Sequence, residues 1–193
     1  MVDNNLNPID TNFVVNNNLY RELFESPGIK IINNFIDRSR FELLKKEIMS
    51  PLFDWYITDK VPNDETDFNF QFCHVFFSYT FEKSKYFNYL NPVLERLNPI
   101  AVNRIKANCV PKTETIQVSS LHVDINEERV IDSNPKTAIF YINTNNGYTL
   151  FEDGTKVESV ENRICIFPYY MKHTGTTCTD KNQRIVININ YTK

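Results

Sequence analysis

The chain has 193 residues, of which 41% are hydrophobic and 23% are charged, a composition typical of one globular domain with its own core. Its apolar runs stay far short of the roughly 18 residues that cross a bilayer, and its first residues do not resemble a secretory signal, so we expect a soluble, cytoplasmic protein without a membrane partner. The net charge is -3 and no segment forms a basic stripe, which argues against strong nucleic-acid binding.

The first twenty or so residues are rich in asparagine and poor in apolar anchors, which predicts an extended arm. Residues 31–37 (IINNFID) then read as a short strand. Asp37 is placed to cap a helix that ends near Pro51, because apolar residues recur behind it at helical spacing: Phe41, Leu44 and Ile48.

Aromatic residues are dense between residues 52 and 90. Phe68, Phe70 and Phe72 alternate with polar residues as in a half-buried strand, and the stretch either overhangs a pocket or packs as core. His74 has no carboxylate at matching spacing, so we interpret it as a hydrogen-bonded structural histidine. Asn91 and Pro92 then begin a second helix.

From about residue 100 the chain changes to short β-rich runs separated by turns: RIKANCV, TAIFYIN, YTLFED, TKVESV, RICIFP and RIVININY. Such spacing favours a jelly roll. We therefore expect a mainly β protein with flanking helices, in which residues 100–193 form a double-stranded β-helix core and residues 1–99 form an N-terminal α/β extension packed on it, within one structural domain. Gly147, Gly154 and Gly175 fall in this half, and we expect all three to serve turn geometry.

Four cysteines lie far apart without a C-x-x-C motif. This spacing indicates neither a zinc ribbon nor a disulfide framework, so we expect reduced, mostly buried thiols.

His122 and Asp124 are two residues apart, so on a strand both side chains would point to one face and could bind one ion. His173 follows after a strand and beside a turn, where a loop-borne ligand could swing back across a barrel mouth. Two imidazoles and one carboxylate form the facial triad that binds iron(II) and leaves positions open for oxygen. Chance H-x-D pairs are common, but this chain has only three histidines and two of them enter the pattern.

Arg184 opens the last β-rich run. On that strand Arg184, Asn188 and Asn190 share one face, while isoleucines occupy the other. The isoleucine face must be buried, so the polar face lines the interior, with Asn188 and Asn190 as candidate pocket residues. An unpaired guanidinium there is costly unless it meets an anion such as a dicarboxylate.

In their order and spacing, His122, Asp124, His173 and Arg184 resemble the 2-oxoglutarate/iron(II) oxygenases of the prolyl-4-hydroxylase type, including uncharacterised members carried by bacteriophages. The resemblance covers residues 100–193 well and residues 31–37 weakly.

This resemblance implies a set of ligands and roles. Iron(II) would be held by the triad, 2-oxoglutarate would be the co-substrate held by Arg184, and molecular oxygen would be the oxidant. Tyr141 sits where the family's tyrosine contacts the co-substrate, and Asn108 is the candidate on the first barrel strand, where many relatives have a tyrosine. No catalytic residue beyond the metal ligands is implied.

The expected activity is that of a dioxygenase that hydroxylates an unactivated C–H bond, with a prolyl or other side chain of a peptide or protein as the first candidate substrate. Two alternatives stay open. One is a catalytically idle jelly roll that binds a metal or ligand. The other is an oxygenase that acts on a small molecule or a nucleic-acid base.

Overall fold

The computed structural model describes residues 22–26, 28–58, 70–78, 83–124 and 135–193. The expected N-terminal arm and the expected strand position of Phe68 lie outside these residues. All four cysteines are described and all are free thiols.

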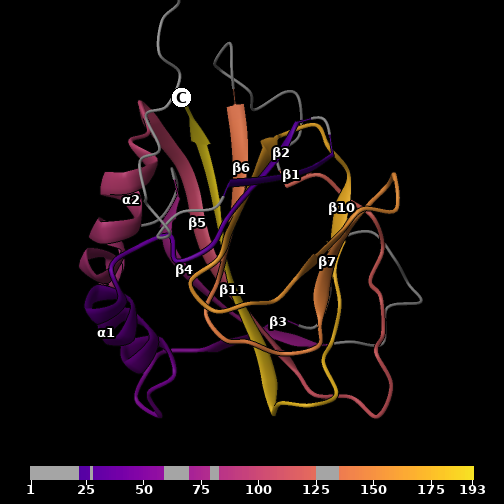
Figure 1. Cartoon of the computed structure of the whole chain (residues 1–193). Helices are drawn as coiled ribbons and strands as arrows, with labels where there is room; N and C mark the ends of the chain where they lie inside the picture. The colour runs from indigo at the N-terminus through magenta and orange to yellow at the C-terminus, as the bar shows by residue number, and fades with distance from the viewer. Residues whose placement is uncertain (1–21, 27, 59–69, 79–82, 125–134) are drawn as a thin grey trace, which may run out of the picture.

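The strands are β1 (Glu22–Ser26), β2 (Ile29–Ile32), β3 (Tyr56–Thr58), β4 (Gln71–Ser78), β5 (Ala101–Pro111), β6 (Pro135–Tyr141), β7 (Tyr148–Phe151), β8 (Lys156–Glu158), β9 (Ile164–Pro168), β10 (His173–Gly175) and β11 (Gln183–Thr192). They form an eight-stranded sheet in the order β1-β2-β9-β6-β11-β5-β4-β3 and a three-stranded sheet in the order β10-β7-β8. The pairs are antiparallel, and the small sheet lies across from the large one (Figure 1). This arrangement confirms the predicted jelly roll with a double-stranded β-helix core.

The helices cover one face of the large sheet (Figure 1). The α1 helix (Arg38–Ile48) begins after Asp37, whose Oδ1 accepts hydrogen bonds from the backbone N–H groups of Ser39 and Arg40, as the sequence predicted. The α2 helix (Asn91–Leu97) has proline in its first turn and follows the 3-10 helix η1 (Phe87–Leu90). None of the described helices is both long and apolar enough to cross a membrane.

Two cores lie on the two faces of the large sheet. One joins the helices to Ala138, Phe140 and the isoleucines of β11. The other fills the space between the sheets and includes Ile139, Tyr141 and Phe151. Because the central strands are covered on both faces, β6 is buried along nearly its whole length, which explains its almost continuous apolar sequence.

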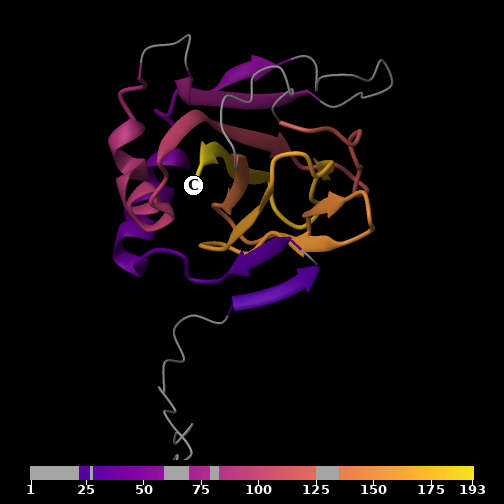
Figure 2. The ribbon, with the colours of Figure 1, turned by 90° about the horizontal axis from the view of Figure 1, so that it is seen from above.

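The edges of the large sheet are built by the N-terminal part of the chain. Figure 2 shows the indigo pair β1 and β2 on one side of the molecule and β3 with β4 on the other. The expected strand at residues 31–37 is shorter and earlier, because β2 ends at Ile32 and the chain turns at Asn34, whose φ is 48°. His74 on β4 is buried, and its ring nitrogens bond the Asp54 carbonyl and the Ser84 hydroxyl, consistent with the structural role expected for it.

Asn162, in the turn before β9, joins this turn to the segment between β2 and α1. Its side chain accepts from the backbone N–H of Ile36 at 3.0 Å and donates to the Ile36 carbonyl at 2.8 Å. Its own carbonyl accepts from the Phe35 N–H at 2.7 Å. Asn162 is 1% exposed and has a φ of 58°, a left-handed conformation that asparagine tolerates better than most residues.

We predict that Asn162→Ala lowers the free energy of unfolding by about 2 to 4 kcal/mol, because it leaves two buried backbone groups unpaired. The matched control is Asn98→Ala, which replaces an exposed asparagine with a φ of 48° and should cost about 1 kcal/mol through backbone strain alone. Urea denaturation of both variants measures the difference. Equal losses would contradict the proposed role of the side-chain bonds.

Candidate functional site

The pairing of β5 with β11 places the polar face of β11 toward the space between the sheets. Ile185, Ile187 and Ile189 are at most 1% exposed and pack beneath the helices, as the alternation predicted. The opposite face borders a cavity of about 330 Å³ whose lining includes Arg184, Val186 and Asn188.

His122 and His173 are brought together by the backbone. Each donates its N–H to the other's carbonyl at 3.0 Å, which makes an isolated β-bridge between residues far apart in sequence. The ring centroids lie 5.2 Å apart. The sequence predicted a loop position for His173, but this residue begins the short strand β10, which pairs with β7.

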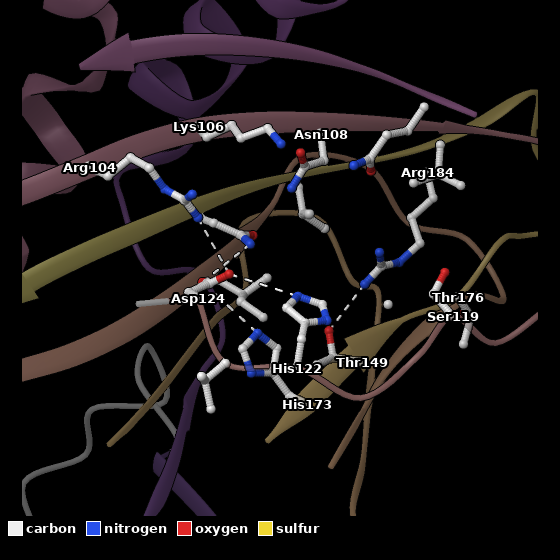
Figure 3. Close-up of a pocket in the computed structure, with 17 residues that line it drawn as sticks. Arg104, Lys106, Asn108, Ser119, His122, Asp124, Thr149, His173, Thr176 and Arg184 are labelled. Atoms are coloured by element: carbon white, nitrogen blue, oxygen red, sulfur yellow. Dashed lines mark hydrogen bonds and ion pairs between the residues drawn. The ribbon is translucent and has the colours of Figure 1, made fainter. Parts of the chain in front are cut away.

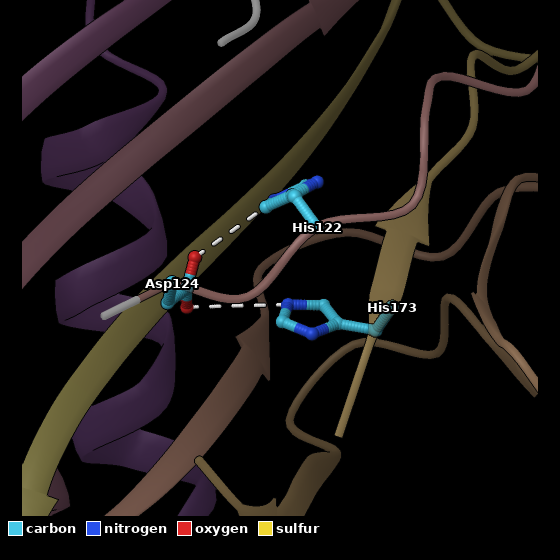
Figure 4. A group of neighbouring side chains, drawn as sticks. All are labelled: His122, Asp124 and His173. Atoms are coloured by element: carbon cyan, nitrogen blue, oxygen red, sulfur yellow. Dashed lines mark ion pairs between the residues drawn. The ribbon is translucent and has the colours of Figure 1, made fainter. Parts of the chain in front are cut away.

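Asp124 completes the group (Figure 4). Its carboxylate oxygens lie 3.9 Å from Nε2 of His122 and 4.0 Å from Nε2 of His173. The candidate ligand atoms of these three residues all lie within 4.8 Å of one another. The structure therefore brings together the three side chains that the sequence selected as metal ligands.

The hydrogen bonds of the two imidazoles leave their Nε2 atoms directed at Asp124. Nδ1 of His122 bonds the Ser120 carbonyl at 3.0 Å, and Nδ1 of His173 bonds the Met171 carbonyl at 3.1 Å. A carbonyl only accepts, so each Nδ1 carries the proton and each Nε2 offers a lone pair, the arrangement of metal-bound histidines. In the described part of the chain, Nε2 of His173 is buried without a hydrogen-bond partner, and burial lowers the pKa of this residue, which favours the neutral ligand form.

Asp124 is held as a carboxylate by its neighbours. Burial alone would raise its pKa, but His173, Arg104, Asn190 and His122 together lower it below its usual value. Asn190 Nδ2 donates to Oδ2 at 3.1 Å, and Asn188 Nδ2 lies 3.5 Å from the same oxygen. Of the two asparagines predicted to line the pocket, Asn188 lines it and Asn190 is fully buried. Both orient Asp124, a role that outer residues commonly have around metal ligands.

Arg184 lies at the other end of the cavity (Figure 3) and is 2% exposed. Its Nε donates to Ser159 Oγ at 2.8 Å and its Nη2 donates to Thr149 Oγ1 at 3.1 Å. No carboxylate among the described residues pairs with it, and burial lowers its pKa. A buried guanidinium with only hydroxyl partners is well suited to bind an anion.

Two glycines make the space for Arg184, which corrects the expectation that they serve turn geometry. A Cβ on Gly147 would lie 2.8 Å from Arg184 Cδ and 2.7 Å from the Thr177 carbonyl oxygen, and a Cβ on Gly175 would lie 3.1 Å from Arg184 Nη1. Of the three glycines expected at turns, Gly154 has a positive φ, at 87°.

The other two expected co-substrate residues differ in their position relative to the cavity: Asn108 lines it and Tyr141 does not. Tyr141 is fully buried behind the cavity wall, and its hydroxyl donates to Thr149 Oγ1 at 2.8 Å. Thr149, rather than Tyr141, lines the cavity. Asn108 does line it, with a buried Oδ1 that has no partner among the described residues, but in the register Val110 is opposite Arg184 and Asn108 is opposite Val186.

Two cations in the cavity were not predicted from the sequence. Arg104 and Lys106 lie on the same face of β5 as Asn108 and line the cavity (Figure 3). Burial lowers the pKa of Lys106. The alternation in Arg104-Ile105-Lys106-Ala107-Asn108 was the available signal, because Ile105 and Ala107 are fully buried and the polar residues between them must face the other way.

Comparison with solved structures identifies the same fold in several proteins of low sequence identity. A prolyl hydroxylase from Trichoplax adhaerens, in complex with a hypoxia inducible factor oxygen degradation domain peptide fragment, superposes with a TM-score of 0.59 and 15% identity over 86% of this chain and 83% of that one. The viral collagen prolyl hydroxylase of Paramecium Bursaria Chlorella virus-1, in a 2OG complex, superposes with a TM-score of 0.54 and 15% identity over 84% of this chain and 94% of that one. An oxidoreductase of the 2OG-Fe(II) oxygenase family from Burkholderia pseudomallei superposes with a TM-score of 0.59 and 11% identity over 86% of each chain. No family model matches the sequence, and no curated protein sequence is significantly similar to it.

We predict that Gly147→Ala weakens the binding of a dicarboxylate at least about tenfold, because the added methyl group displaces Arg184 and the loss of one charge-assisted hydrogen bond has about this effect. Calorimetric titration with 2-oxoglutarate measures the affinity. The control is Gly154→Ala, whose Cβ meets no atom within 4 Å and which should change stability but not affinity. Wild-type affinity in Gly147→Ala would contradict the role assigned to this glycine.

Proposed function

We propose that this protein is a 2-oxoglutarate- and iron(II)-dependent dioxygenase that hydroxylates an unactivated C–H bond. One observation carries the proposal. One cavity has the Nε2 atoms of two imidazoles and a carboxylate at one end and a buried arginine without a carboxylate partner among the described residues at the other. Two histidines and one carboxylate match the facial triad of iron(II) oxygenases, and the unpartnered Nε2 of His173 fits a metal ligand.

In this proposal His122, Asp124 and His173 hold the iron, and Arg184 with Thr149 binds the far carboxylate of 2-oxoglutarate. Asn108 lies between these ends and offers its amide to the co-substrate, while Tyr141 positions Thr149 through their hydrogen bond. When bound, iron, 2-oxoglutarate and oxygen supply the oxidation, in which the co-substrate becomes succinate and carbon dioxide and a C–H bond becomes C–OH.

The remaining residues of the cavity support this chemistry by orientation and by exclusion of water. Asn188 and Asn190 fix the carboxylate of Asp124. Part of the cavity wall is apolar and is formed by Val110, Ile139 and Val186. An apolar wall lowers the local dielectric constant and so strengthens the electrostatic interactions of the bound anion.

For the substrate, we propose a side chain in a peptide or protein, with proline as the first candidate. The support is the likeness in fold to two prolyl hydroxylases, one of them bound to a peptide fragment. A cavity that opens beside Arg104, whose side chain is 35% exposed, gives such a substrate access to the triad.

We predict that anaerobic addition of iron(II) and 2-oxoglutarate produces a weak visible charge-transfer band, because bidentate binding of the keto acid needs the open positions of the triad. Asp124→Ala should abolish the band and turnover with little loss of folding stability. Glu114→Ala, which removes an exposed carboxylate from the same connection between β5 and β6, should leave both intact. A folded wild-type protein that gives no band would count against the proposal.

We also predict that peptides containing proline raise the rate of succinate formation above the uncoupled background, whereas methylated single-stranded oligonucleotides do not. Free amino acids provide the third arm of the assay. Stimulation by oligonucleotides alone would overturn the peptide proposal but would leave the assignment of the iron site standing.

A further inference from the structure

Two cations at the triad end of the cavity bind neither the metal nor the co-substrate in the function proposed above. Arg104 and Lys106 project from β5 into the cavity on the face they share with Asn108 (Figure 3). In the register they are opposite Asn190 and Asn188, the residues that hold Asp124, whereas Arg184 is opposite Val110. Along β5 this places Lys106 and Arg104 roughly 13 to 20 Å of strand away from the level of Arg184.

The charges of the described residues that line the cavity do not balance. Among these residues Arg104, Lys106 and Arg184 contribute three positive charges and Asp124 contributes one negative charge, a net charge of +2 with neutral imidazoles. A divalent metal and a dianionic co-substrate cancel each other when both bind, so the excess of two positive charges would remain. Charges withdrawn from water are stable only when an opposite charge or strong hydrogen bonds compensate them.

The hydrogen bonds of these two cations leave donors available. Arg104 donates through Nε to Asn190 Oδ1 at 3.2 Å, and its Nη2 lies 3.5 Å from Asp124 Oδ1. Lys106 forms no hydrogen bond or ion pair with another described residue. The side chain of Arg104 is 35% exposed and that of Asp124 only 4%, so Arg104 can be reached from solvent next to the triad.

We propose that Lys106 and Arg104 form a second anion site, which binds a carboxylate of the primary substrate beside the C–H bond that is oxidised. This inference rests on the proposed function and narrows it, because the substrate is then itself a carboxylic acid. The carboxylate belongs either to a free amino acid or to a peptide, as an acidic side chain or the chain end. Lys106 supplies a compact charge and Arg104 a planar fork, a pair that suits a carboxylate.

The direct test uses acetate as the probe. The protein is loaded with zinc(II) and saturating 2-oxoglutarate, so that Arg184 and the triad are occupied, and its melting temperature is followed against acetate, acetamide and chloride at constant ionic strength. Acetate should raise the melting temperature saturably and acetamide should not, because a ligand that binds the folded state stabilises it. Acetate that acts no differently from chloride would overturn the proposal.

Variants of Lys106 test whether this residue binds the acetate. Lys106→Met should weaken acetate binding at least about tenfold and Lys106→Arg should retain most of it. The matched control is Lys112→Met, which removes an exposed lysine just beyond the end of β5 and should bind acetate as the wild type does. If Lys106→Met weakens 2-oxoglutarate as strongly as it weakens acetate, Lys106 binds the co-substrate and the proposal is wrong.

A second arm identifies the source of the carboxylate. Free amino acids, peptides with a free chain end and peptides with an acidic side chain are each compared with their carboxamides for succinate formation above background. The acid of at least one pair should act at least about tenfold better than its amide. Amides that stimulate as well as their acids would overturn the proposal, whereas the absence of succinate and of the charge-transfer band would instead refute the proposed function, with acetate binding still measurable.

Discussion

The antiparallel pairing of β5 with β11 is the constraint on which both the core and the cavity depend. The register runs from Gln183 opposite Pro111 to Thr192 opposite Ala101, with a single irregularity after Asn190. Side chains alternate between the two faces of a strand, so one register buries the isoleucines of β11 beneath the helices and directs Arg184 and Asn188 into the cavity, with Asn190 buried against Asp124. A slip of one residue would exchange these faces, so the core that stabilises the fold also fixes the position of the polar groups.

Much of this arrangement could be predicted from the sequence because it depends on local periodicity. The alternation in β11 and the Asp37 cap are local patterns, and the structure has both as expected. His122 and Asp124 lie close together, but they are not on the strand that was expected, because His122 forms only an isolated bridge and Asp124 follows in a bend. The strand β10 could not be predicted, because its three residues become a strand only through pairing with β7 and the bridge to His122. The role of Gly147 in leaving space for Arg184 could not be predicted either, since it depends on where the side chain of Arg184 lies in the folded protein.

The positive charge of the cavity is the other feature that could not be predicted from the sequence. The whole chain carries a net charge of -3, yet the described lining of the cavity has Arg104, Lys106 and Arg184 with Asp124 as its one carboxylate. Arg104 and Lys106 are separated by an apolar residue and lie far from Arg184 along the sequence, so no basic stripe is visible. The pairing of β5 with β11 brings the three cations to one face of the sheet. Net charge describes the solvent-facing surface of such a protein better than it describes its interior.

The bridge between His122 and His173 has a consequence for how this site can change in evolution. It consists of two main-chain hydrogen bonds, so it holds positions 122 and 173 side by side whichever side chains they carry. If these residues bind the proposed metal, substitutions there would change or abolish metal binding without dismantling the barrel. Arg184 and its hydroxyl partners lie at the far end of the cavity, so the proposed anion pocket does not depend on the metal ligands. Under the proposed function, a descendant that lost its metal would keep the means to bind a dicarboxylate and could serve as a sensor for it.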